Sequence, residues 1–280
     1  MNIETVHQCN CCLGNKTLHP LVSAIDLSKA NVMQRTIKFD FYTILLYYDY
    51  SNATMIFLTP GQSININEGK AFPRKGWLLA FHPDLLCSTS LGRNIKNYSF
   101  FSYHLNEALH LSLREKDKAI ECMYNIEKEL QHAIDCHSKT LISRYIELLL
   151  DYCSRFYDRQ FITRNEVNKA ILNKMDIALD GYIQSGQLKN GVLPSTKYCA
   201  DILHLSPRYF SDLLKFETGK NLDEYFQLKR LEVAKEMLLG KGYTVSSVAE
   251  KLGYPSVQYF SNLFRKLVGV SPCEYRLSQN

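Results

Sequence analysis

The sequence predicts an α+β chain in which an antiparallel β-barrel or sandwich precedes a helical hairpin and an all-helical C-terminal part. Short aromatic and β-branched runs, separated by Gly, Pro and Asn, fill the first third and are typical of antiparallel strands. After about Leu105, two stretches that lack Gly and Pro show helical spacing. The last part of the chain contains an internal repeat, which is more specific than any single motif.

The expected strands lie between turn-forming residues such as Pro60-Gly61 and Pro83. Four runs have the composition of strands, and they cover residues 43–50, 54–58, 63–67 and 77–81. Their even spacing predicts one antiparallel β domain at the start of the chain.

Two helices are expected over residues 115–134 and 138–157, separated by a short break, and this arrangement predicts an antiparallel hairpin within about 105–157. Apolar positions of the second helix recur every three or four residues, at Leu141, Ile142, Tyr145, Ile146, Leu148, Tyr152, Cys153 and Phe156. Because this surface is too wide for one domain face, we expect part of it to contact a second copy and form a homodimer.

Loop-forming residues at Ser185-Gly186, Asn190-Gly191 and Pro194 predict a boundary between residues 184 and 195. The chain is therefore expected to divide into residues 1–160, a connecting helix and linker at 161–195, and a C-terminal domain at 196–280.

The composition is mildly basic, with a formal net charge of +5 and a pI of about 8.6. This charge permits nucleic-acid binding without requiring it. The start of the sequence has no signal-peptide pattern, and no apolar stretch reaches the roughly 18 residues of a membrane span. We therefore expect a cytoplasmic protein with no membrane partner, whose nine cysteines are thiols.

The internal repeat has an offset of fifty positions, since Tyr209-Phe210-Ser211 recurs as Tyr259-Phe260-Ser261 and Gly219 recurs as Gly269. Each copy is expected to be a helix, a tight turn and a second helix. The repeat therefore predicts two helix-turn-helix units in residues 196–280.

Local signals mark the start of the second helix in each copy. Ser206 and Ser256 are good N-caps, and Pro207 suits the first helical position. Gly253 supplies a left-handed turn residue in the second copy, and His204 is expected to take the same conformation in the first.

The second helix of each copy has an inner and an outer face. The inner faces are expected to be Phe210, Leu213, Leu214 and Glu217, and Phe260, Leu263, Phe264 and Leu267. The side chains expected to contact base edges in the major groove are Arg208, Ser211, Asp212, Val257, Gln258, Ser261 and Asn262. Those expected to neutralise phosphates are Lys215, Arg265 and Lys266. A solvated polar face would explain either helix alone, but the repetition favours DNA binding.

Residues 222–239, between the copies, are apolar on two sides and predict a buried helix that fixes the distance between the units. Two such helices on one side of a duplex are expected about 34 Å apart, one helical turn.

Residues 195–278 resemble the AraC/XylS family of bacterial transcription regulators. The resemblance is carried by Ala200, Leu205-Ser206, Tyr209-Phe210, Lys215, Gly219, Arg230, Ala234, Val248-Ala249, Gly253-Tyr254, Tyr259-Phe260, Phe264-Arg265-Lys266, Gly269, Ser271-Pro272 and Tyr275-Arg276. It implies a cytoplasmic, often dimeric factor that binds double-stranded DNA and usually activates transcription, with RNA polymerase as a partner. It also implies that residues 1–160 form a cupin-like β-barrel with a hairpin, which senses a small-molecule effector. Asp212 departs from the pattern, because a carboxylate accepts a hydrogen bond from cytosine but repels phosphate.

The cysteines near the start leave three alternatives open. Cys9, Cys11 and Cys12 lie near His7 and His19, but the second separated pair of ligands found in structural zinc sites is missing. A metal site and a redox-sensitive arm are therefore alternatives to a flexible N-terminus.

No catalytic motif emerges from the sequence. His82 follows an apolar run, but residue 84 is Asp, so the His-x-His pair of a metal-dependent barrel enzyme is missing and His82 is expected to end a strand. No Gly-x-Ser-x-Gly or phosphate-binding loop is present. We expect no enzyme, cofactor or metal. The alternatives are a redox- or partner-responsive regulator without a metabolite ligand and, less favoured, a β-barrel enzyme with a helical appendage; the effector-binding residues are not identified.

Overall fold

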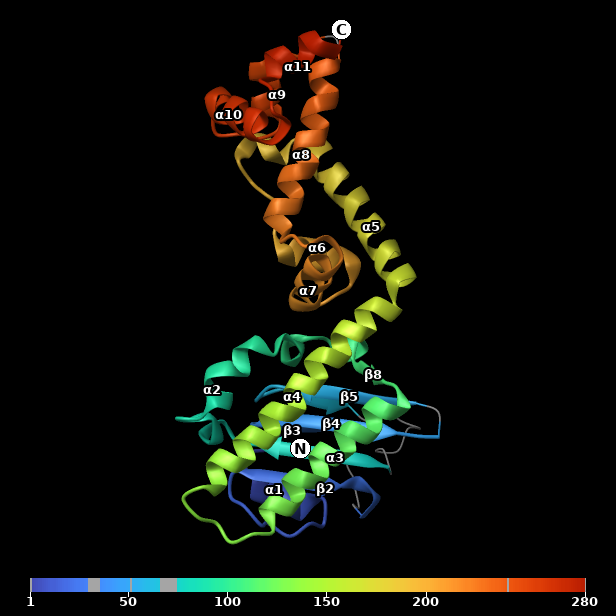
Figure 1. Cartoon of the computed structure of the whole chain (residues 1–280), viewed down its shortest axis with the longest axis vertical. Helices are drawn as coiled ribbons and strands as arrows, with labels where there is room; N and C mark the ends of the chain where they lie inside the picture. Colours follow the sequence, from blue (N-terminus) through green and yellow to red (C-terminus); the bar gives the residue numbers. More distant parts are fainter. Residues whose placement is uncertain (1, 30–35, 51, 66–74, 241, 280) are drawn as a thin grey trace. The chain divides into compact units, whose positions relative to one another are not determined.

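The computed structural model describes residues 2–29, 36–50, 52–65, 75–240 and 242–279 (Figure 1). The chain divides into two compact units, Met1–Thr163 and Arg164–Asn280. The first unit contains β-sheets and helices, and the second is helical, so the predicted α+β class is confirmed.

The first unit contains two sheets. The smaller has the order β1 (Asn2–Ile3), β3 (Thr36–Phe39) and β6 (Ser63–Asn65). The larger has the order β2 (Val22–Asp26), β7 (Gly76–Phe81), β4 (Tyr42–Tyr48), β5 (Ala53–Leu58) and β8 (Leu109–Leu111), and all its pairs are antiparallel. Three of the predicted strands correspond to β4, β5 and β7. The first three residues of the fourth, predicted over 63–67, form β6, and residues 66 and 67 lie outside the described residues.

The cupin-like barrel that the resemblance implied is not confirmed, because the strands of the described part of the chain form two separate sheets and no closed barrel. The reason is visible in β7, which is buried along its whole length. Leu78 and Ala80 belong to a core that also contains Ile37 and Phe39 of the smaller sheet. Burial against a second sheet on one face and helices on the other covers the larger sheet without closure.

The predicted hairpin is formed by α3 (Leu113–Leu130) and α4 (Ser138–Thr163), which pack against each other and against the larger sheet, while α2 (Ser90–Asn94) packs on α4. Cys153 of α4 reaches Met55 of β5, with 3.9 Å between the two sulfur atoms. Ile142, Ile146 and Cys153 are buried, whereas Leu141 and Leu148 are 42% and 45% exposed. The wide apolar stripe of α4 is therefore divided between an inner face and an outer face.

The second unit consists of α5 (Asn165–Gln184), α6 (Thr196–Leu203), α7 (Pro207–Thr218), α8 (Leu222–Leu239), α9 (Val245–Lys251), α10 (Val257–Val268) and α11 (Pro272–Gln279). α5 was expected to be a connecting segment, yet it packs on α6 and α7. Its residues Met175, Leu179 and Tyr182 share a core with Cys199 and Phe210. Within the residues described, every helix is too short or too polar to span a membrane.

Candidate nucleic-acid interface

The two turns have the backbone conformations that were expected. His204 (φ 56°) and Gly253 (φ 68°) are both left-handed. Ser206 Oγ accepts a hydrogen bond from the Tyr209 N–H at 3.2 Å, and Ser256 Oγ accepts one from the Tyr259 N–H at 3.0 Å. Each second helix therefore starts at a capped residue directly after a turn, and both predicted helix-turn-helix units are confirmed.

One hydrophobic core joins the two helix-turn-helix units through α8. The cluster contains Phe210 and Leu214 from α7, Phe226 and Leu238 from α8, and Phe260 with Phe264 from α10. Figure 1 shows α8 extending from the α6–α7 pair to the group formed by α9, α10 and α11. The predicted buried helix between the copies is confirmed, and α7 and α10 belong to one packed body.

α11 fixes the far end of α8. Arg276 donates from Nε to the Leu238 carbonyl at 2.9 Å and from Nη2 to the Tyr243 carbonyl at 2.5 Å. Because these carbonyls lie at and beyond the C-terminus of α8, the arginine satisfies acceptors that a helix end leaves unpaired.

The inner faces of α7 and α10 agree with the sequence at most positions. Phe210, Leu213, Leu214, Phe260 and Phe264 are buried. Leu267 was placed on the inner face, but it is 43% exposed. It lies in the last turn of α10, which Gly269 ends, and there the neighbouring residue Val268 packs against the core instead.

The predicted DNA-contacting residues divide by exposure. Those with exposed side chains are Arg208, Lys215, Val257, Gln258, Asn262, Arg265 and Lys266. Ser211, Asp212 and Ser261 are half-buried. The structure thus brings one set together on α7 and the other on α10, and their contact with DNA stays a prediction.

The outer face of α7 is partly occupied by internal contacts. Arg208 Nε lies 4.0 Å from Asp212 Oδ2, one helical turn away. Ser211 Oγ donates to the Pro207 carbonyl at 2.9 Å. On α10, Asn262 stands where α7 has Asp212, and the helix contains no acidic residue. The electrostatic attraction for a phosphate backbone is therefore greater at α10 than at α7.

The N-terminal cysteines lie on a helix, α1 (Val6–Cys12), so the flexible N-terminus that was expected is wrong. Cys9 is fully buried, and burial raises the pKa of its thiol to about 12, with a smaller contribution from Cys12. Cys11 is exposed, and its Sγ lies 3.5 Å from His7 Nε2. His7 Nδ1 lies 2.9 Å from Thr17 Oγ1, which orients the imidazole.

The metal alternative gains no support from these positions. Among the described residues, no group of three His, Cys, Asp or Glu side chains is arranged to hold an ion. β7 ends at Phe81, and His82 directly after it caps the 3-10 helix Pro83–Leu86, where its Nδ1 accepts a hydrogen bond from the Asp84 N–H at 3.2 Å.

Comparison with known proteins finds relatives for the C-terminal region. Residues 199–278 match the family model described as a helix-turn-helix domain. The chain is 39% identical over 88 residues to the transcriptional regulatory protein YesN of Bacillus subtilis, covering 30% of this chain and 24% of YesN. It is 39% identical over 80 residues to the HTH-type transcriptional regulator YobQ of the same organism, covering 29% and 33%.

Residues 199–278 therefore carry a helix-turn-helix domain similar to those of bacterial transcription regulators. A solved structure of the C-terminal domain of AraT, a response regulator from Geobacillus stearothermophilus, is 32% identical, covers 37% of this chain and 84% of that one, and has a TM-score of 0.31. The matches span between a quarter and a third of the length of YesN and YobQ. The matched helix-turn-helix domain therefore accounts for most of α6 to α11 and leaves α5 and the first unit to be explained separately.

Proposed function

We propose that this chain is a sequence-specific transcription regulator that binds double-stranded DNA through α7 and α10. The observation that carries this proposal is the pair of capped helices, each behind a turn, held by one core with their polar faces outward. We place it in the cytoplasm, without catalytic activity, and propose RNA polymerase as the partner through which it activates transcription.

The first unit is proposed to control the DNA-binding unit by binding a small molecule. A cavity of about 470 Å³ lies between the end of β5, the start of β6 and the segment that precedes β8. Leu58, Gln62, Tyr103 and His104 line it. Its volume suits a small metabolite, because ligand pockets typically enclose about 300–1,000 Å³.

The homodimer is proposed to form through the outer face of α4. Leu141 and Leu148 lie two turns apart on that helix and are each more than 40% exposed. Apolar side chains at this spacing form a contact stripe along a helix, which a second copy of α4 would bury.

Replacing Arg265 with alanine is expected to weaken DNA binding at every sequence, because we propose that its exposed guanidinium contacts a phosphate. The slope of log affinity against log salt concentration should fall by about 0.9, the value for one lost phosphate contact on duplex DNA. The measurement is a mobility-shift titration at several salt concentrations, with an operator selected from a random DNA pool.

Lys174→Ala is the matched control for Arg265→Ala, since Lys174 is an exposed cation of the same unit but lies on α5. This control should keep the affinity and the salt slope of the parent chain. An unchanged slope in Arg265→Ala, or an equal change in the control, would remove Arg265 from the proposed interface.

A second candidate is a regulator that responds to thiol oxidation, and the contact between Cys11 and His7 favours it. The imidazole takes the Cys11 proton, and the thiolate attacks one sulfur of a low-molecular-weight disulfide. A mixed disulfide forms on Cys11, and the other half leaves as a thiolate that is then protonated.

Treatment with glutathione disulfide is expected, under this second candidate, to change the DNA affinity of the parent chain about fivefold or more, a typical size for coupling between sites. Cys11→Ser should abolish the response, and Cys87→Ser, which removes another exposed thiol, should retain it. Mass spectrometry of the intact chain reports the adduct. A response that survives in Cys11→Ser would exclude this cysteine.

A further inference from the structure

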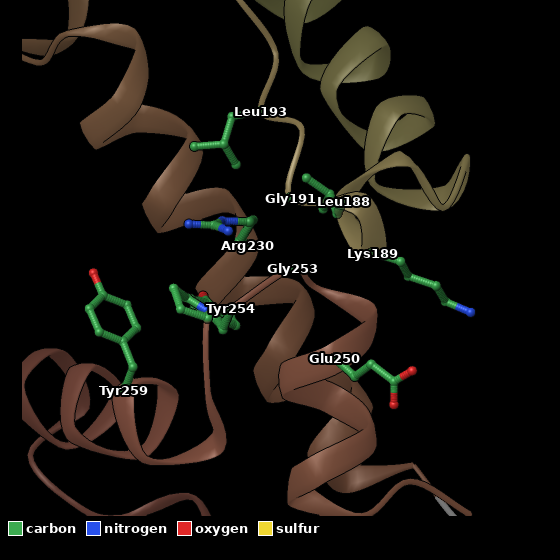
Figure 2. Close-up of a pocket in the computed structure, with 10 residues that line it drawn as sticks. Leu188, Lys189, Gly191, Leu193, Arg230, Glu250, Gly253, Tyr254 and Tyr259 are labelled. Carbon is green, nitrogen blue, oxygen red and sulfur yellow. The ribbon is translucent and has the colours of Figure 1, made fainter.

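A cavity of about 550 Å³ lies inside the DNA-binding unit, where the 3-10 helix Gln187–Asn190, α8 and the turn between α9 and α10 meet (Figure 2). Apolar and aromatic residues form half of its lining, among them Leu193, Tyr254 and Tyr259. Lys189 and Glu250 also line it, but Figure 2 shows that the charged ends of both side chains point away from Arg230.

Arg230 is the buried charge of this cavity, with 8% of its surface exposed. Its Nη1 donates to the Leu252 carbonyl at 3.1 Å, and its guanidinium lies over the rings of Tyr254 and Phe226 at 4.5 and 5.5 Å. Nε has no hydrogen-bond partner, and none of the ion pairs among the described residues involves Arg230. A buried cation without a counter-charge is costly, so the site is complementary to an anion.

Tyr254 adds a second unused polar group. Its hydroxyl is buried without a hydrogen-bond partner. Burial raises the pKa of Tyr254, which outweighs the opposite effect of Arg230, so the hydroxyl keeps its proton and can act as a donor. Two donors next to apolar walls are what a ligand with an anionic head and an apolar body requires.

We propose that this cavity binds a small molecule with a carboxylate on an apolar body. The carboxylate accepts hydrogen bonds from the Arg230 guanidinium, because its planar fork of donors matches a carboxylate. Leu193 and Tyr259, which are 46% and 49% exposed, cover the apolar body. A phosphate of a duplex stays at the protein surface, so the depth of Arg230 favours a small ligand.

The position of the cavity gives such a ligand a role in regulation. The cavity is lined by Arg230 of α8, by Tyr254 and Pro255 of the turn between α9 and α10, and by Tyr259 in the first helical turn of α10. Because these elements set the orientation of α10, occupancy changes the affinity of that helix for DNA. This site lies in the DNA-binding unit and is distinct from the effector cavity proposed for the first unit.

The test is calorimetric titration of the full chain with benzoate, and with benzamide as the neutral analogue of the same shape. Benzoate is expected to saturate one site and to bind about tenfold more tightly than benzamide, which corresponds to about 1.4 kcal/mol from charge-assisted hydrogen bonds. Equal affinities, or no saturable binding of benzoate, would overturn the proposal. These measurements use no operator, so they succeed or fail independently of the proposed regulatory function.

A pair of variants locates the site without disturbing Arg230. Leu193→Glu places a carboxylate on the cavity wall, where it competes for the guanidinium, and should abolish benzoate binding. Leu193→Gln has nearly the same shape without the charge and should retain it. Equal benzoate affinities in the two variants would also overturn the proposal. So would displacement of benzoate by a random-sequence duplex, because that result would assign Arg230 to the DNA backbone.

Discussion

Gly253→Ala is expected to destabilise the C-terminal unit by about 2–5 kcal/mol, the sum of backbone strain and overpacking. Gly253 has a φ of +68°, a conformation that disfavours any residue with a Cβ atom. The added Cβ would lie 2.2 Å from the Leu188 carbonyl oxygen and 2.9 Å from the carbonyl carbon. Both are backbone atoms, so the clash forces the turn away from the 3-10 helix that Leu188 belongs to.

Denaturant unfolding of the full chain, followed by far-UV circular dichroism, measures this loss. Trp77 is the single tryptophan and lies on β7 of the first unit, so its fluorescence supplies an internal control that should not shift. Gly269→Ala is the matched variant, since Gly269 has a φ of +94° and an added Cβ would meet no described atom within 4 Å. It should lose only about 1–2 kcal/mol, and equal losses in both variants would contradict the steric role of Leu188.

Replacing Gln258 and Asn262 together with alanine is expected to remove most sequence discrimination at α10. Each exposed amide can make a bidentate contact with adenine, and such a contact is worth about 1–3 kcal/mol of discrimination. The double variant should therefore lose roughly 30-fold or more in affinity for the selected operator. Affinity for random DNA, which depends on phosphate contacts, should stay near that of the parent chain.

The corresponding change on α7 provides the comparison. Arg208 and Asp212 lie 4.0 Å apart and partly satisfy each other, so Arg208→Ala should cost less operator affinity than the α10 double variant. Competition titrations against both DNAs distinguish the two effects. A uniform loss on operator and random DNA would show that Gln258 and Asn262 contribute no sequence information.

The two helix-turn-helix units were predictable because their signals are local. Ser206 and Ser256 cap the helices that follow them, and His204 and Gly253 take positive φ values at the turns. These features depend on a few neighbouring residues, and the repeat presented each of them twice. The prediction of a flexible N-terminus around the cysteines was wrong because α1 has only seven residues. A helix of this length is too short to show a clear apolar periodicity in the sequence.

The remaining features depend on contacts between distant residues. Closure of a barrel requires the edge strands to pair with each other. The edge strands of the larger sheet are β2 and β8, and their composition does not indicate whether they pair. The outward position of Leu267 depends on which residue of the last turn of α10 meets the core, and a helical wheel does not show that Val268 takes this place. The cavity at Arg230 is built from Leu193, Arg230 and Tyr254, three segments whose proximity no local pattern indicates.

The continuous packing of Phe210, Phe226 and Phe260 along α8 has a consequence for operator architecture. A protein whose halves are joined by a flexible tether tolerates extra base pairs between its half-sites, but here the interval is set by one helix of invariant length. Inserting a few base pairs rotates one half-site around the duplex, and α8 has no slack with which to follow it. Operators of this chain should accordingly vary in sequence far more readily than in spacing.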